Sequence, residues 1–308
     1  MSGQVRSRLA RREAITASVL LAPCLIGLAV FLVYPLVANL YYSMTNYDLL
    51  SNASWVGLDN YRFMFTRDAQ FWQAVRNTLL FVLIAVPLQV GYAVLLAVLV
   101  TSIRRMSIVY RTLFYLPALL PPVAATMGFA FVFNPASGQI NRILSWLNLP
   151  TPHWLHDDRM ARWVFVAMIL WGAGNTIVVM IAGVLDVPEQ LYEAAALDGA
   201  GVVGRFLHVT LPMLRPVIVF ATVTGLIACL QLFTQPYVAN QVTASSNTFV
   251  VGYPDGATMF YTTWIYQQAF SFFNVGYGSA LSVVLFVVSL IFAGVVLKIG
   301  NFTEGTTE

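Results

Sequence analysis

The chain has 308 residues, of which 59% are hydrophobic and only 9% are charged, with a formal net charge of +3. A soluble domain carries about a quarter of its residues as charged side chains. The composition therefore excludes an ordinary soluble protein and predicts an all-α, polytopic membrane protein. The small net charge also gives no reason to expect a nucleic-acid partner.

Residue counts exclude several classes of site. Cys24 and Cys229 both lie in apolar runs, which indicates buried thiols rather than a disulfide framework or a metal site. Lys298 is the only lysine and is followed by Ile299, whereas a Walker A loop needs Gly-Lys-Ser/Thr. We therefore expect no catalytic residue, no bound metal and no cofactor in this chain.

The first predicted membrane helix covers residues 15–41 and follows four arginines. Arginines before an apolar run are also typical of a signal peptide. This run is too long for the apolar part of a signal peptide and lacks a small-x-small cleavage site, which favours an uncleaved helix. Residues 46–76 are rich in aromatic side chains, as is typical of a segment at the membrane–water interface.

Five further apolar runs predict a total of six membrane spans in one transmembrane domain, residues 1–308. A span needs about 20 apolar residues. The further spans are residues 74–100, 108–133, 161–185, 213–238 and 275–299.

Positive charge predicts the orientation of the spans, because cytoplasmic segments carry more Lys and Arg. A cytoplasmic N-terminus places ten such residues inside: Arg6, Arg8, Arg11, Arg12, Arg104, Arg105, Arg111, Arg205, Arg215 and Lys298. Six then lie outside: Arg62, Arg67, Arg76, Arg142, Arg159 and Arg162. This bias predicts that both termini and the loop of residues 186–212 are cytoplasmic.

The loop of residues 186–212 carries helix signals of its own. Asp186 predicts an N-cap, with Pro188 in the first turn and Glu189 completing a capping box. The helix should end at Leu197, because Gly199 can take the left-handed conformation that closes a helix.

A second short helix is expected at residues 202–209, and residues 210–212 should cap the fifth span. The small side chains of residues 194–196 would let another protein approach the backbone, and Glu193 would offer one charge to a basic partner. The alternative is an ordinary loop between two helices.

Seven positions of this loop match a known signature, Glu-Ala-Ala, three residues, Gly, nine residues, an aliphatic residue, one residue, Leu-Pro. The matching residues are Glu193, Ala194, Ala195, Gly199, Val209, Leu211 and Pro212. The pattern resembles the cytoplasmic motif of permease subunits of binding-protein-dependent ABC importers.

The resemblance extends over nearly the whole chain and is to the carbohydrate branch, the maltose and glycerol-phosphate type. It is carried by Trp55-Val-Gly-Leu-Asp-Asn-Tyr61, Phe71-Trp72, Asn77-Thr78-Leu79, Arg111-Thr-Leu-Phe-Tyr-Leu-Pro117, Phe133-Asn-Pro135, Ile265-Tyr266, Ala269-Phe270 and Gly276-Tyr277-Gly-Ser-Ala280. One departure is Tyr253-Pro-Asp-Gly256, where the family often has a Gly-Gly-Pro turn. That difference concerns the preference for a substrate or binding protein.

The resemblance implies a six-helix permease of the type I importer fold, in a bacterial plasma membrane. It implies a second homologous permease subunit, two cytoplasmic ATPase subunits and an extracytoplasmic solute-binding protein as partners. The loop would be the coupling helix that docks into an ATPase. The residues implied in coupling are Glu193, Ala194, Ala195, Asp198 and Gly199.

Polar residues inside predicted spans are candidates for a sugar pathway, because each one needs protein or water beside it. Trp171 and Asn175 should share one face of span four, with Gly172 giving room. Thr224, Gln231 and Gln235 should form a stripe on span five, next to Gly225, and Gln89 and Tyr92 lie three residues apart on span two. The alternative is that these side chains bond one helix to another.

Two rival functions need different features. A secondary transporter would need carboxylates at mid-membrane, and the nearest is Asp186. A scaffold subunit without cargo would not explain the seven-position motif.

The cargo itself stays open between a sugar and glycerol-3-phosphate or a glycerophosphodiester. The lack of Arg or Lys in the middle of any predicted span favours a neutral sugar. The metal-capable segment from His153 to Asp158 lacks a known ligand pattern and is expected to be a solvated loop.

Overall fold

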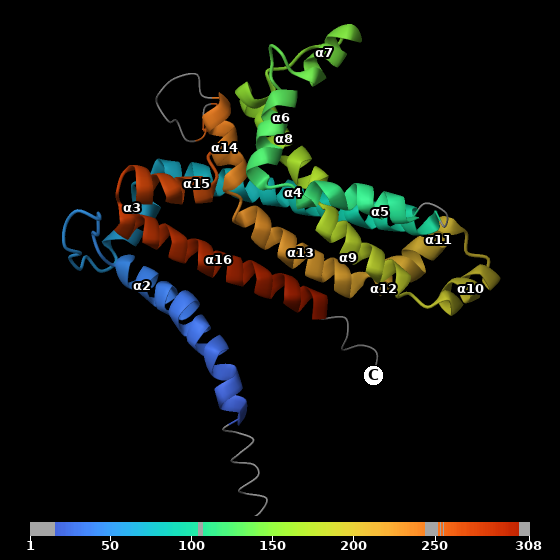
Figure 1. Cartoon of the computed structure of the whole chain (residues 1–308), viewed down its shortest axis with the longest axis horizontal. Helices are drawn as coiled ribbons and strands as arrows, with labels where there is room; N and C mark the ends of the chain where they lie inside the picture. Colours follow the sequence, from blue (N-terminus) through green and yellow to red (C-terminus); the bar gives the residue numbers. More distant parts are fainter. Residues whose placement is uncertain (1–15, 104–106, 244–251, 253, 255, 302–308) are drawn as a thin grey trace, which may run out of the picture. The chain divides into compact units, whose positions relative to one another are not determined.

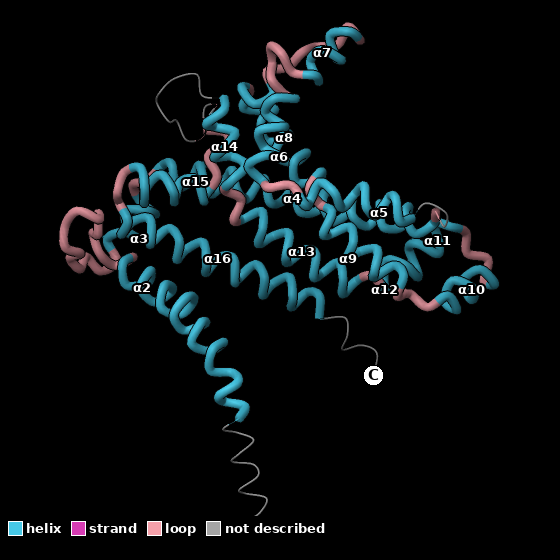
Figure 2. Tube along the Cα trace, in the orientation of Figure 1, coloured by secondary structure: helices cyan, strands magenta, loops and turns pink. Residues whose placement is uncertain are grey.

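The computed structural model describes residues 16–103, 107–243, 252, 254 and 256–301. Within these ranges the chain is built of helices, with one isolated antiparallel bridge between Thr45 and Trp55 (Figure 2). The all-α prediction is confirmed. The N-terminal arginines, Arg104 and Arg105 and part of the Tyr253–Gly256 turn lie outside the described residues.

The predicted spans are present as four single candidates and two bent pairs. Four helices are long and apolar enough to cross a membrane: Thr16–Tyr42, Ala69–Ser102, Arg215–Val242 and Val275–Gly300. Two helix pairs pass the same test together: Ile108–Leu119 with Pro122–Val132, bent by 98°, and Asp158–Trp171 with Gly174–Leu185, bent by 48°. Counting each pair as one span gives up to six spans.

The two bent pairs correct the prediction of continuous helices at residues 108–133 and 161–185. The first pair breaks at Pro121 and Pro122, because a proline ring removes a backbone donor and collides with the preceding turn. The second breaks at Gly172 and Ala173, where Gly172 ends α8 (Asp158–Trp171) and Ala173 precedes α9 (Gly174–Leu185). Glycine lacks the side-chain packing that would hold a helix straight.

The chain divides into two compact units, and the first comprises Met1–Arg67 with Gln268–Val284. Its first span contains a π-helical turn, η1 (Ala29–Val33), followed by α2 (Tyr34–Tyr42). Pro35 explains the wide turn, because its ring needs space at the carbonyl four residues earlier.

The segment after the first span is folded against itself. Asn60, on α3 (Asp59–Thr66), donates to the carbonyls of Ser43 and Thr45 at 2.9 and 2.8 Å. The backbone N–H of Gly276 donates to Tyr47 at 2.8 Å, and a Cβ at position 276 would lie 2.1 Å from the Thr45 carbonyl oxygen. Only glycine fits at so close a backbone approach.

The second unit comprises Asp68–Gln267 with Leu285–Glu308 and is organised around α4 (Ala69–Ser102), a helix of 34 residues. α9 and α13 (Arg215–Leu230) pack most extensively against it (Figure 1). The remaining helices of this unit are α5 (Ser107–Tyr115), η2 (Leu116–Leu119), α6 (Pro122–Val132), α7 (Gln139–Trp146), η3 (Trp154–His156), α8, α10 (Glu189–Leu197), α11 (Val202–Arg205), η4 (Phe206–Thr210), α12 (Leu211–Met213), α14 (Thr234–Thr243) and α15 (Tyr261–Tyr266). Two helices run from one unit into the other: η5 (Gln267–Ser271) and α16 (Val275–Asn301).

Small residues let these helices approach closely. A Cβ at Gly174 would lie 2.8 Å from the carbonyl oxygen of Phe114, so α9 and α5 touch backbone to backbone. A Cβ at Gly183 would lie 2.8 Å from the Leu214 side chain. Inside a membrane, where burial of apolar surface does not drive association, such close packing is a main source of helix–helix stability.

Asp68 ties the start of α4 to α15. Its Oδ1 accepts from the N–H groups of Gln70 and Phe71 at 2.9 and 3.0 Å, as an N-cap, and its Oδ2 accepts from Trp264 Nε1 at 3.0 Å. The side chain is buried, with 7% of its surface exposed. One carboxylate therefore satisfies three donors that have little access to water.

We predict that Asp68→Ala destabilises the second unit. Loss of the cap and of a buried acceptor should cost about 1–3 kcal/mol and lower the thermal unfolding midpoint of the detergent-purified protein. Asp59→Ala is the matched control, because Asp59 lies in the first turn of α3 and is exposed. Equal midpoints for the two variants would contradict a stabilising role for Asp68.

Candidate functional site

The predicted coupling loop forms a helical hairpin made of α10, α11, η4 and α12. The predicted capping box at its start is wrong. Asp186 is the C-cap of α9, its backbone N–H donates to Ala182 at 3.1 Å, and α10 follows Pro188 without a side-chain cap. The chain leaves α9 and enters α10 over only three residues, so Asp186 is needed to end one helix rather than to begin the next.

The predicted end of the first hairpin helix is confirmed. Gly199 has φ +82°, in the left-handed region. The N–H of Ala200 donates to Ala195 at 2.9 Å and the N–H of Gly199 donates to Ala196 at 3.1 Å. These two bonds form a Schellman motif, which satisfies the last carbonyls of α10 and turns the chain sharply.

The second half of the hairpin is helical over the predicted range but changes type. α11 runs from Val202 to Arg205, and η4 continues it as a π-helix to Thr210. The helix then passes directly into α12, so residues 210–212 continue the helix instead of capping the fifth span. Tyr192 and Thr210 hold the two arms together through a 3.0 Å contact between their hydroxyl oxygens.

The outer surface of this hairpin exposes apolar side chains beside charged ones, and no part of the isolated chain that the structure describes covers it. α10 has no buried residue, and Leu197 and Val202 are 90% and 78% exposed. The predicted coupling residues Glu193, Ala194 and Gly199 are exposed, and a Cβ at Gly199 would meet nothing within 4 Å. Asp198 is exposed as the C-cap of α10, whereas Ala195 is half-buried.

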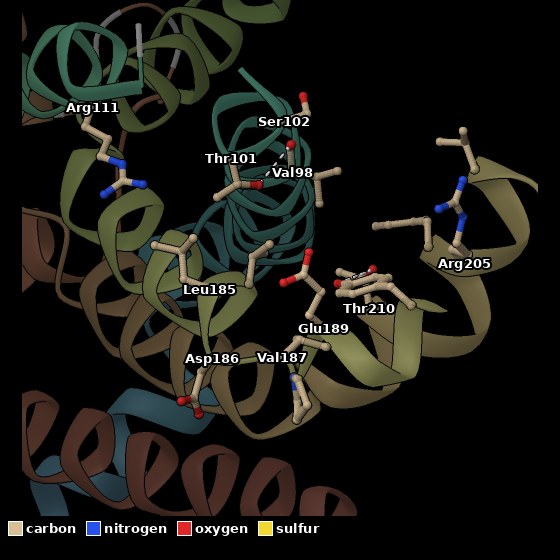
Figure 3. A pocket seen from close by; sticks show the side chains of 15 residues that line it. Val98, Thr101, Ser102, Arg111, Leu185, Asp186, Val187, Glu189, Arg205 and Thr210 are labelled. Carbon is tan, nitrogen blue, oxygen red and sulfur yellow. Dashed lines mark hydrogen bonds between the residues drawn. The ribbon is translucent and has the colours of Figure 1, made fainter. Parts of the chain in front are cut away.

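A groove of about 910 Å³ lies between this hairpin and the ends of α4, α5 and α9. In Figure 3 the carboxylate of Glu189 points into the groove, Arg205 and Arg111 lie on opposite sides of it, and Asp186 points away. The sequence analysis used both arginines as orientation signals, and Arg111 also as part of a segment that resembles the family, but it predicted no site for either. The groove brings them together from separate helices, and no local pattern in the sequence predicts this.

A second cavity, of about 190 Å³, collects several of the predicted pathway residues. Its walls include four of the predicted residues, Gln89, Trp171, Gly172 and Gln235, together with Phe129. The ring of Trp171 packs edge-on against Phe129, with centroids 5.4 Å apart. Gln89 also donates to Thr176 Oγ1 at 3.4 Å, so this amide has an interhelical partner as well as a place in the cavity wall.

Gly225 is buried beside this cavity, where a Cβ would lie 3.2 Å from Gln89 Oε1. The other predicted residues, Asn175, Thr224 and Gln231, are exposed and do not line it. Thr224 donates to the carbonyls of Phe220 and Ala221 on its own helix.

The predicted geometry for these residues needs two corrections. Trp171 and Asn175 do not share one helix face, because the 48° bend falls between them. Thr224, Gln231 and Gln235 do not form a stripe on one helix, because α13 ends at Leu230 and Gln235 lies on α14. A role in substrate contact stays a prediction for all of them.

Among the described residues, no three His, Cys, Asp or Glu side chains gather as a metal site. In the segment from His153 to Asp158, Asp157 caps α8 by accepting from the N–H of Arg159 at 2.8 Å. Burial, with a smaller contribution from the neighbouring His153, holds the pKa of His156 below its usual value. Both effects disfavour a positive charge on the ring.

Comparison with known proteins identifies the family. No family model matches the chain. A probable ABC transporter permease protein of Bacillus subtilis is 32% identical over 299 residues, covering 96% of this chain and 94% of the relative. The sulfoquinovosyl glycerol transport system permease protein of Agrobacterium fabrum is 35% identical over 293 residues, covering 93% and 91%. The chain belongs to the family of carbohydrate ABC transporter permeases. The trehalose/maltose transport system permease protein of Thermococcus litoralis is 30% identical over 308 residues, covering 98% and 99%.

Solved structures agree on the fold of this ABC permease. A bacterial ABC transporter involved in the import of the acidic polysaccharide alginate gives a TM-score of 0.81 at 21% identity, covering 99% of this chain and all of the other. The bacterial alginate ABC transporter in complex with its pentasaccharide-bound periplasmic protein gives 0.78 at 21% identity, covering 96% and 95%. The relatives are transport permeases, so the chain is a membrane permease rather than an enzyme.

Proposed function

We propose that this permease forms half of the translocation pathway of an ATP-driven sugar importer and is coupled to a cytoplasmic ATPase through residues 193–212. The observation that carries the coupling proposal is the hairpin of α10 and α11. A rigid Schellman turn presents exposed small and apolar side chains that the chain itself does not cover. Exposed apolar side chains that gather on one surface are typical of a protein–protein interaction site.

The proposed assembly has a second homologous permease subunit, two ATPases and an extracytoplasmic solute-binding protein. The cavity around Trp171 supports a second permease, because about 190 Å³ is below the 300–1,000 Å³ of ordinary ligand pockets. One chain would then supply one wall of a shared pathway. A binding-protein partner is supported by the alginate transporter of the same fold, which was solved with its periplasmic protein.

The proposed cargo is a neutral sugar or a sugar-like solute. The cavity walls contribute amides and aromatic rings, including Gln89, Gln235 and Trp171, and none of the lining residues is charged. Amides bond hydroxyl groups, and rings stack on sugar faces. The alternatives glycerol-3-phosphate and glycerophosphodiesters carry a phosphate that would be expected to need a cation. A secondary transporter is disfavoured, because Asp186 is exposed at the end of α9.

We further propose that residues 1–308 act as one transmembrane domain in the bacterial cytoplasmic (inner) membrane, with both termini inside. The excess of positive charge on one side supports this orientation.

The orientation predicts the outcome of reporter fusions. Fusions at Ser107 and Val202 should report a cytoplasmic position, and fusions at Asn148 and Ser246 an external one. Ser246 lies outside the described residues. Alkaline phosphatase activity and green fluorescence in the same strains would measure the two sides. A reversed result at any two of the four positions would contradict the orientation.

The coupling turn predicts a contrast between two glycines. Gly199→Val forces a β-branched residue to φ +82°, which should cost about 1–3 kcal/mol and disturb the hairpin. Gly201→Val is the matched control, because Gly201 has φ −69° and open space around it. In membrane vesicles, only Gly199→Val should lower both uptake and binding-protein-stimulated ATP hydrolysis. Normal coupling in Gly199→Val would mean that the hairpin is only a connector.

The cavity predicts a loss of transport without a loss of assembly. Trp171→Ala removes an aromatic face worth about 0.5–1.5 kcal/mol, so the KM for uptake should rise by up to about tenfold. Basal ATP hydrolysis should be unchanged, because the hairpin is intact. Trp163→Ala is the control, since Trp163 is exposed on α8 and does not line the cavity. If Trp171→Ala transported normally but destabilised the complex, Trp171 would be an interhelical packing residue.

A further inference from the structure

In the second unit, a groove lined by polar and charged residues lies next to a groove lined by apolar residues. The polar groove is the 910 Å³ space of Figure 3 between the hairpin and the ends of α4, α5 and α9. The apolar groove, of about 530 Å³, runs along α4. Its lining residues are Val90, Gly91, Val94, Leu95, Val98, Val202, Val203, Phe206, Leu211 and Ile218. Val98, Val202 and Phe206 line both grooves, so the two form one continuous surface.

The hydroxyl groups of the polar groove already have partners. Thr101 and Ser102 donate to carbonyls of their own helix, at 2.8 and 2.7 Å for their shortest bonds. The hydroxyls of Tyr192 and Thr210 contact one another.

The charged groups of the polar groove are left for a ligand. The Nε atoms of Arg111 and Arg205 are buried and make no hydrogen bond. The carboxylate of Glu189 points into the groove between the two guanidinium groups (Figure 3). The groove therefore offers two cationic groups that could bind a phosphate and one anionic group that could bind an amine.

The apolar groove has almost no polar surface to offer. All ten of its lining residues are apolar, and Leu95, Val202 and Val203 are more than half exposed. Such a surface is suited to a hydrocarbon chain. The groove follows α4, an apolar candidate membrane span, toward its end at Ser102, where the apolar sequence stops.

We propose that the two grooves together bind one phospholipid with an amine-bearing headgroup, such as phosphatidylethanolamine. The phosphate lies against Arg205, the ammonium group lies against Glu189, and one acyl chain lies along the apolar groove. Arg205 is well placed for this role, because Val202 and Phe206, in the same helical turn, line both grooves. The proposal does not depend on the transported solute.

The charges decide between possible ligands. A free phosphate would use the arginines but leave the apolar groove empty. A phospholipid without an amine, such as phosphatidylglycerol, would place its negative phosphate near the negative carboxylate of Glu189, with no positive group on the lipid to bind that carboxylate. A phospholipid with an amine uses both signs of charge and the apolar surface.

The test measures the lipid that stays with the full chain after mild detergent extraction from bacterial membranes, by native mass spectrometry. Arg205→Gln removes the phosphate ligand, and Gly91→Phe fills the apolar groove at a position where a Cβ would meet nothing within 4 Å. The matched controls are Arg215→Gln, at an exposed arginine outside both grooves, and Gly294→Phe, at an equally open glycine of α16.

The wild-type chain and both controls should retain one phosphatidylethanolamine. Each groove variant should retain about tenfold less phosphatidylethanolamine. Arg205→Gln loses a hydrogen bond to a charged group, and Gly91→Phe loses the contact with the acyl chain. After exchange into phosphatidylglycerol alone, the wild-type chain should lose the retained lipid. Inorganic phosphate should not displace phosphatidylethanolamine.

Three results would overturn the proposal. The first is equal lipid retention in Arg205→Gln, Gly91→Phe and the wild-type chain. The second is equal retention of phosphatidylglycerol and phosphatidylethanolamine. The third is cross-linking of Gly91→Cys, labelled with a thiol-reactive photoactivatable reagent, to a second permease subunit in native membranes, which would mean that a protein covers the groove. Because Gly91→Phe and Arg205→Gln act at opposite ends, failure of one variant to fold leaves the other as a test.

Discussion

The packing of α9 and α13 against α4 is the constraint on which the second unit depends. Within a membrane, every backbone donor and acceptor must be satisfied without water, so the helices can gain stability only by fitting closely. Gly174 lets α9 approach α5, and Gly183 lets α9 approach Leu214 and Val217 at the start of α13, since a side chain at either glycine would collide there. On α4 itself, buried alanines such as Ala85 and Ala93 leave room for a neighbouring helix.

The breaks in the spans bring polar side chains to the cavity. α8 and α9 change direction at Gly172, which leaves Trp171 at the cavity wall. α13 ends at Leu230, and the chain resumes as α14, which brings Gln235 to the same wall. A pair of straight helices would place these side chains on their own surfaces. The interruption of regular structure is therefore what collects polar groups at one place inside an apolar bundle.

The hairpin is connected to the bundle by direct helical continuity. η4 passes into α12, and α13 begins two residues after α12, while the contact between Tyr192 and Thr210 joins α10 to the same arm. A force on the exposed face of α10 would thus reach α13 through contiguous backbone rather than through a loose loop. The polar groove lies beside this connection, with Glu189 and Arg205 on its walls. Whatever occupies the groove would touch both arms of the hairpin.

The sequence by itself determined the all-α membrane character, the approximate spans and the left-handed turn at Gly199, because composition, apolar length and glycine act locally. It misjudged Asp186, since an aspartate can end one helix as well as begin another. Only the tertiary structure decided which polar residues meet. Helical spacing assumes a straight helix, and the bend at Gly172 separates Trp171 from Asn175. Residues from distant segments, such as Arg111 and Arg205, come to one groove because α4, α5, α9 and the hairpin together form its walls, and no periodicity within a helix records that arrangement.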